Sequence, residues 1–192
     1  MLLFNGFIWL LSLLLLATGL LIARLAYRQP FMWICLAGLF GIYMLNVIRY
    51  TFFPFPIHPQ LIALMRTVGA EPGMIRLNWI PFYSQYYPSI FHDRSNYLNI
   101  LMTVPYGILL PLLLPMSRKR MLLCALGIGV VIETLQGLLD LWLGYTYRTV
   151  DINDVIFNFI GAMIGWGLLW FVYETSFGKK RLARWLPIMV KK

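Results

Sequence analysis

Five long apolar runs constrain this chain more than any other feature of its sequence. They cover residues 7–23, 31–48, 99–115, 121–143 and 155–173. A helix of roughly 20 mostly apolar residues crosses the hydrocarbon core of a bilayer while satisfying its own backbone hydrogen bonds. The sequence therefore predicts an all-α integral membrane protein with about five transmembrane helices. The third run has the weakest signal, because Pro105 and Pro111 interrupt it and predict kinks.

Composition agrees with a multi-pass protein of the cell membrane whose solvent is lipid. Hydrophobic residues make up 60% of the 192 positions and charged residues 12%, whereas soluble domains are about half apolar and a quarter charged. The net charge of +9 does not indicate a nucleic-acid partner, because eleven of the sixteen Lys and Arg residues flank apolar runs. Cys35 and Cys124 each lie near the start of such a run, where they indicate packing residues and not a disulfide or zinc pair.

The basic residues predict how the chain is oriented. They follow the first run (Arg24 and Arg28), the third run (118–120) and the fifth run (tail 174–192). The basic residues of the tail are Lys179, Lys180, Arg181, Arg184, Lys191 and Lys192. Since such clusters stay in the cytoplasm, the N-terminus is predicted outside and the C-terminus in the cytoplasm. No positive region precedes the first run, so we interpret it as an uncleaved span of one membrane domain, 1–192.

The longest loop, 49–96, is then predicted to lie outside. It is rich in proline and aromatic residues, which favour the membrane interface over open water. Within it, residues 61–68 could form a short interfacial helix, and Tyr83, Tyr86 and Tyr87 could form an aromatic belt. The simpler interpretation is that this loop caps the helix bundle.

Polar residues inside the fourth run carry the first functional signal. Glu133, Gln136 and Asp140 are spaced three and four apart, so they share one helical face. Glu133 lies near the middle of the run, where an ionised carboxylate costs a few kcal/mol or more unless it is paired. The sequence therefore implies a partner, a bound proton or a water-filled pocket at this face.

A second polar stripe opens the fifth run. It steps three and four residues at a time through Arg148, Asp151, Asp154, Asn158, Gly161 and Gly165. Because a short segment joins the fourth and fifth runs, we expect a helical hairpin that brings Gln136 and Asp140 towards Asp154 and Asn158 at similar depth.

Each of these residues also has a structural interpretation. Asp151 could be a helix N-cap, and Arg148 could neutralise the acidic cluster. Gly161 and Gly165 have the spacing of closely packed membrane helices, and Gln136 and Asn158 could hydrogen-bond between helices. Glu133 and Asp154 fit such roles least well.

Catalytic signatures are weak. The two histidines, His58 and His92, lack metal-ligand spacing, and neither a G-x-S-x-G nor an H-E-x-x-H motif occurs. Asp151, Asp154 and Glu133 could hold Mg²⁺ against a lipid diphosphate, but we expect no metal or cofactor and assign no catalytic residue.

Several short motifs follow one another in a recognisable order. They are Asn78-Trp-Ile-Pro-Phe82, Asn99, Pro105-Tyr-Gly107, Glu133-x-x-Gln136 and Arg148-x-x-Asp151-x-x-Asp154-x-x-x-Asn158-x-x-Gly161. Together they resemble the VanZ-like family over residues 78–166, the last motif being the most specific. One departure is Tyr106, where the family more often has an apolar residue, and it is expected to add a hydroxyl near the site.

The resemblance implies a bacterial, mainly Gram-positive protein of the cell envelope, whose namesake lowers susceptibility to the antibiotic teicoplanin. Our leading interpretation is an outward-facing polar pocket that binds an amphiphile, either a lipid-linked cell-wall precursor or the acyl chain of a lipoglycopeptide. The expected lining is Glu133, Gln136, Arg148, Asp151, Asp154 and Asn158, supported by Asn78, Asn99 and Asp140.

Three alternatives stay open at this point. The protein could be an enzyme acting on a lipid or polyprenyl phosphate head group, with Glu133 or Asp154 as base and Arg148 holding the phosphate. It could be a lipid transporter or flippase with Glu133 as a proton relay, or a scaffold for partners in the cell envelope.

Overall fold

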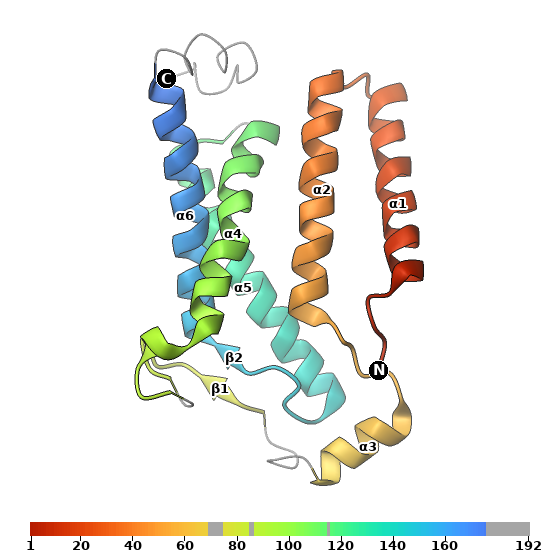
Figure 1. Cartoon of the computed structure of the whole chain (residues 1–192), viewed down its shortest axis with the longest axis vertical. Coiled ribbons are helices and arrows are strands. Elements are labelled where there is room, and N and C mark those ends of the chain that lie inside the picture. The colour runs from red at the N-terminus through yellow and green to blue at the C-terminus, as the bar shows by residue number, and fades with distance from the viewer. Residues whose placement is uncertain (69–74, 85–86, 115, 176–192) are drawn as a thin grey trace.

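The computed structural model describes residues 1–68, 75–84, 87–114 and 116–175 (Figure 1). In this part of the chain, five helices are long and apolar enough to cross a membrane, which confirms the predicted class. They are α1 (Gly6–Leu25), α2 (Phe31–Phe52), α4 (Arg94–Leu113), α5 (Arg118–Leu143) and α6 (Ile152–Glu174). Pro105 and Pro111 both lie inside the single helix α4. The basic residues of the tail from Lys179 onwards and Tyr86 lie outside the described residues.

Four of the five long helices, all except α2, begin slightly before the predicted runs, where polar residues cap them. The side chains of Asn5, Asp93, Ser117 and Asp151 accept hydrogen bonds from backbone N–H groups in the first turns of α1, α4, α5 and α6. Such caps satisfy donors that a helix leaves unpaired at its start. Hydropathy alone does not report the early starts of α4 and α5, since their capped first turns are polar.

The two ends of the bundle differ in character. The α1–α2 connection, with Arg24 and Arg28, lies at the same end as the start of α5, with the basic residues 118–120 (Figure 1). We call this the basic end. The opposite end, which we call the loop end, holds the N-terminus, the long loop and the α5–α6 connection. The two basic clusters among the described residues are thus on one side of the bundle, while its orientation in the membrane stays a prediction.

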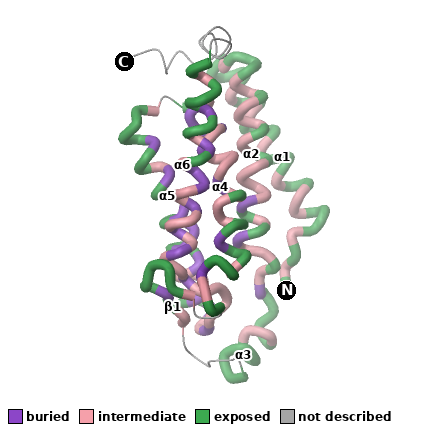
Figure 2. The backbone as a smooth tube through the Cα atoms, turned by 60° about the vertical axis from the view of Figure 1, so that its left-hand side comes forward, coloured by how far each residue is buried: buried purple, intermediate pink, exposed green. Residues whose placement is uncertain are grey.

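Helices α4, α5 and α6 form the packed core. Buried residues gather on these three helices (Figure 2), whereas α1 has none. Gly161 lies against the backbone of Ile100 and the Thr103 hydroxyl, and Gly165 lies against the backbone of Val104. The close approach of α4 and α6 therefore confirms the predicted packing role of these two glycines.

The loop end is built from short elements. Besides helix α3 (Pro59–Val68), which confirms the helix expected at 61–68, it contains the one-turn helix η1 (Ile90–His92) and two strands, β1 (Leu77–Asn78) and β2 (Val150–Asp151). The strands pair in parallel, with Leu77 opposite Val150 and Asn78 opposite Asp151. The long loop is thus tied directly to the segment that enters α6.

The end of α5 is fixed by its neighbours. Gly144 closes the helix with a φ of 72°, a left-handed conformation that glycine adopts without strain. The Arg66 Nε of α3 donates to the Leu143 carbonyl at 2.6 Å, which pairs one of the carbonyls left free at the helix end. The Tyr147 hydroxyl donates to the Pro54 carbonyl.

The prediction that Asp140, in the fourth span, lies at the depth of Asp154 and Asn158 in the fifth span was wrong. Its Oδ1 accepts hydrogen bonds from the backbone N–H groups of Tyr147 and Arg148, at 2.9 and 3.1 Å. The connection then runs back along α5, so that the Asp151 N–H donates to Glu133 Oε2 at 2.8 Å before α6 begins. Asn158 consequently packs near Gly129 instead of near Asp140.

Candidate functional site

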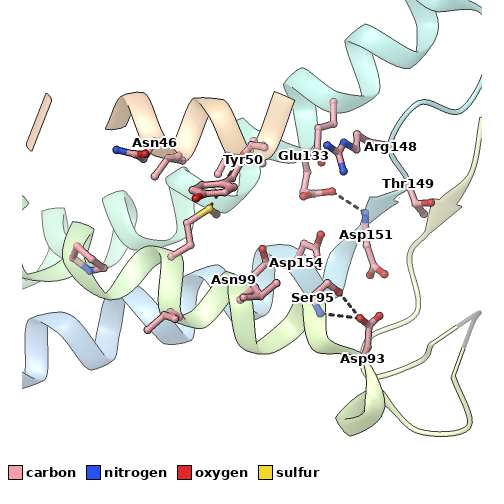
Figure 3. A pocket seen from close by; sticks show the side chains of 18 of the residues that line it. Asn46, Tyr50, Asp93, Ser95, Asn99, Glu133, Arg148, Thr149, Asp151 and Asp154 are labelled. Carbon is pink, nitrogen blue, oxygen red and sulfur yellow. Dashed lines mark hydrogen bonds between the residues drawn. The ribbon is translucent and has the colours of Figure 1, made fainter. Parts of the chain in front are cut away.

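A pocket of about 1000 Å³ opens at the loop end, between α2, α4, α5 and the start of α6. Its polar side chains come from five parts of the chain (Figure 3). They are Tyr43, Asn46, Tyr50 and Thr51 of α2, Ser84, Tyr87 and Asp93 of the long loop, Ser95 and Asn99 of α4, Glu133 and Gln136 of α5, and Arg148, Thr149, Asp151 and Asp154 around the start of α6. The pocket therefore brings together residues far apart in the sequence.

Glu133 and Gln136 form the buried side of the pocket on α5. Glu133 is only 5% exposed and Gln136 8%. Glu133 Oε2 accepts the Asp151 N–H, but neither its Oε1 nor the Gln136 Oε1 has a hydrogen-bond partner among the described residues. A buried acceptor without a partner is costly, so this wall is suited to a donor from a ligand or from water.

Asp151 combines the structural and the pocket interpretations. Its Oδ1 caps α6 by accepting the Asn153 N–H at 2.7 Å, and it also accepts a hydrogen bond from Asn78 Nδ2 at 3.0 Å. Asn78 itself is buried and does not line the pocket; its Nδ2 also donates to the Tyr83 carbonyl at 3.0 Å. Asn78 thus holds Asp151 in place from the long loop.

Two more carboxylates complete the acidic part of the lining. The Asp154 side chain rises from α6 beside Asn99 of α4 (Figure 3). Asp93 lies at the start of α4, where its Oδ1 accepts hydrogen bonds from the Ser95 N–H at 2.9 Å and the Ser95 hydroxyl at 2.6 Å. With Glu133 and Asp151, four acidic residues in the described part of the chain line the pocket.

Arg148 is the one basic residue among the described residues that line the pocket. Its guanidinium carbon lies 5.4 Å from the centre of the Tyr147 ring, and its Nη2 donates to the Phe53 carbonyl at 3.3 Å. The Phe53 carbonyl thus holds one nitrogen of the guanidinium, and the Tyr147 ring covers one of its faces. Its buried Nε has no hydrogen-bond partner among the described residues.

Besides Asn78, two of the expected residues lie away from the pocket lining. Asn158 is one turn further into the bundle and 1% exposed, and its carbonyl accepts the Thr103 hydroxyl at 2.7 Å. Asp140 holds the α5–α6 connection instead. The Tyr106 hydroxyl, expected near the site, instead donates to the Cys124 carbonyl at 3.4 Å, and Tyr106 is not among the lining residues.

The α2 wall was missed by sequence reasoning. Tyr43, Val47 and Tyr50 recur at helical spacing and face the pocket together with Asn46. The Tyr43 hydroxyl donates to the Met102 carbonyl at 2.7 Å, which ties α2 to α4. The sequence did contain a signal for this wall: Tyr43, Asn46 and Tyr50 are spaced three and four residues apart within an apolar run. The same spacing identified the polar face of Glu133.

Asn153 was also overlooked, because the polar stripe predicted at the start of the fifth span includes Asp151 and Asp154 but not the residue between them on the chain. It is buried, its Oδ1 accepts the Phe82 N–H at 2.7 Å, and its Nδ2 donates to the Tyr83 carbonyl at 2.8 Å. It therefore fastens the long loop to the first turn of α6, next to the pocket.

Part of the lining of the pocket is exposed on the side of the bundle, and we call this part its mouth. Tyr50, Leu98 and Leu101 line it and are each more than 60% exposed. A second, mainly apolar pocket of about 460 Å³ lies along α5 and shares Glu133 and Asp151 with the first. Among the described residues, no group of three or more His, Cys, Asp or Glu side chains is placed to hold a metal ion.

Comparison with known proteins gives one match. The model of the VanZ/LLP1 family matches residues 40–173. This range contains the motif region 78–166 and also the α2 wall of the pocket, 43–51. No curated protein and no solved structure matches the chain. Since the family match spans well over half of the sequence, this membrane protein belongs to the VanZ/LLP1 family.

Proposed function

We propose that this protein binds an amphiphile in the pocket at the loop end. The observation that carries the proposal is a single pocket that joins a polar region to an apolar wall. The head group would lie against Glu133, Gln136 and Asp154. The hydrocarbon chain would lie along α2 and α4.

The apolar wall supports this arrangement of the ligand. Leu98, Leu101, Met102 and Pro105 of α4 and Val47 of α2 line the pocket. The exposed position of Leu98 and Leu101 on a membrane-spanning helix places apolar surface at the mouth. A hydrocarbon chain could therefore enter from the bilayer without leaving an apolar environment, while its head group reaches the polar region.

The antibiotic link rests on the family resemblance together with the predicted orientation. If the loop end faces outwards, the pocket opens towards the outer leaflet. There it would meet a lipid-linked cell-wall precursor or the acyl chain of a lipoglycopeptide. We propose that the protein lowers susceptibility to teicoplanin in this way.

Susceptibility in a teicoplanin-sensitive Gram-positive host tests the proposal. The host would carry an empty vector, the parent protein, the Asp154→Asn variant or the Glu174→Gln variant, at matched amounts in the membrane. Glu174→Gln is the control, since it removes one acidic group at the last position of α6, far from the pocket lining. Vancomycin is measured alongside teicoplanin.

We expect the parent and Glu174→Gln to raise the teicoplanin concentration needed for inhibition, with little change for vancomycin. Asp154→Asn should lose the protection. Full protection by Asp154→Asn would separate the phenotype from the pocket. No protection by the parent would refute the antibiotic role in that host and leave amphiphile binding to be measured directly.

A further inference from the structure

We propose that the head group bound in the pocket is a cation, an ammonium group, and not a phosphate. This inference rests on the proposed binding of an amphiphile and narrows its chemical class, because it disfavours a lipid-linked precursor that enters the pocket with a phosphate head. It is drawn from the charges that line the pocket and from the hydrogen-bonding groups that its buried wall presents.

The charge balance of the pocket is acidic. Among the described residues, its lining contains the four carboxyl groups of Asp93, Glu133, Asp151 and Asp154 and one guanidinium, that of Arg148. The four come from the α4 cap, α5, β2 and α6, so they surround the polar region and do not form one exposed patch (Figure 3). A phosphate would bring further negative charge into this site, whereas an ammonium group would offset part of it.

The buried wall calls for a hydrogen-bond donor. The Glu133 side chain is only 5% exposed, and its Oε1 has no hydrogen-bond partner among the described residues. Its other oxygen is already held by the Asp151 N–H at 2.8 Å, which fixes the carboxylate in the wall. Gln136 Oε1, one turn along the same face, is likewise buried and without a partner there. An ammonium group has three donors and no acceptor, so it complements these two oxygens.

Arg148 presents only part of its fork to a phosphate, because its Nη2 is already engaged and only its buried Nε has no partner among the described residues. Bidentate phosphate binding uses two parallel N–H groups of one guanidinium edge. Here Nη2 donates to the Phe53 carbonyl, and one face of the group lies over the Tyr147 ring. Arg148 therefore serves better as a fixed counter-charge to the carboxylates than as an anchor for an anion.

The test compares three amphiphiles that differ only in their head group: tetradecylammonium, tetradecyl phosphate and tetradecanol. Binding to the full chain in nanodiscs is measured by native mass spectrometry, with empty nanodiscs as the blank. The variants are Glu133→Gln, Asp154→Asn and Arg148→Gln, with Glu174→Gln as the matched control. Glu133→Gln keeps an oxygen that can accept the Asp151 N–H, and thermal unfolding checks that each variant remains folded.

We expect tetradecylammonium to bind at least about tenfold more tightly than tetradecyl phosphate, because charge-assisted hydrogen bonds are worth this much or more. Glu133→Gln and Asp154→Asn should each weaken ammonium binding by about tenfold. The control Glu174→Gln should leave it unchanged, whereas Arg148→Gln, which removes the positive charge from the lining, should tighten it.

Equal or tighter binding of the phosphate, with ammonium binding unchanged in Glu133→Gln, would overturn the ammonium inference while leaving amphiphile binding intact. If none of the three compounds binds above the empty nanodisc, the proposed function itself fails. The two failures are thus distinguishable.

Discussion

Helix α1 and the three-helix core of α4, α5 and α6 are all apolar enough to span a membrane, yet they are built differently. Helix α1 has no buried residue, and its leucines are exposed over most of its length. The core combines close glycine contacts with buried polar groups such as Thr103, Asp140 and Asn158. Hydrophobicity thus accounts for insertion of both regions, whereas small and polar residues determine which helices pack together.

The largest difference between the two regions should appear at their glycines. In Gly161→Ala the new methyl group would collide with the Ile100 backbone, so α4 and α6 must separate, at a cost of about 3 kcal/mol. In α1, a Cβ added at Gly19 would meet no described atom within 4 Å apart from its chain neighbours and the nearby backbone of its own helix. Gly19→Ala should leave stability unchanged or raise it, because alanine is the better helix former. Thermal unfolding in detergent measures both, and equal effects would contradict the comparison.

Buried side-chain hydrogen bonds should give the next largest difference. Asp140 is fully buried, and its Oδ1 accepts two backbone N–H groups of the α5–α6 connection. Asp140→Ala leaves both donors unpaired and should destabilise the protein by about 2 kcal/mol. Asp140→Asn keeps an oxygen acceptor and should cost clearly less. Hydrogen exchange at residues 144–151 reports the change locally, and identical exchange in the two variants would show that Asp140 acts through its charge instead.

The smallest effect should come from the polar cap of α1. Asn5 Oδ1 accepts the Ile8 N–H at 3.1 Å, and Asn5 is exposed. Asn5→Ala should lower the stability of the protein by about 0.5 kcal/mol, the low end for loss of an N-cap, because little else depends on the residue. The same unfolding measurement applies. A loss as large as that of Asp140→Ala would mean that α1 supports the core more than its burial indicates.

What the sequence predicted well is what depends on local pattern. The five spans follow from hydropathy. The shared face of Glu133 and Gln136 follows from helical spacing, and both residues line the same pocket in the structure. The α2 wall obeys the same spacing through Tyr43, Val47 and Tyr50, so it could have been found.

Other features depend on contacts between distant segments and left no periodic signal. Each strand of the β1–β2 pair has two residues, too few for an alternating pattern. The register of α6 on α5 depends on Asp140 holding residues 147 and 148, and on the Asp151 N–H reaching Glu133. Neither contact follows from the spacing of residues along one helix, which is why Asp140 was expected beside Asn158.

The position of a bound hydrocarbon chain tests the central claim most directly. Two photoactivatable alkyl probes, identical in their diazirine-bearing chain and different only in an ammonium or phosphate head, would be crosslinked to the protein in nanodiscs and mapped by peptide mass spectrometry. We predict that at least one probe labels α2 at residues 43–51 and α4 at residues 98–105, that excess unlabelled probe competes this labelling away, and that α1 shows only background. Labelling of α1 and α4 to the same extent, unaffected by competitor, would show that lipid contacts the bundle everywhere alike and would contradict a binding pocket.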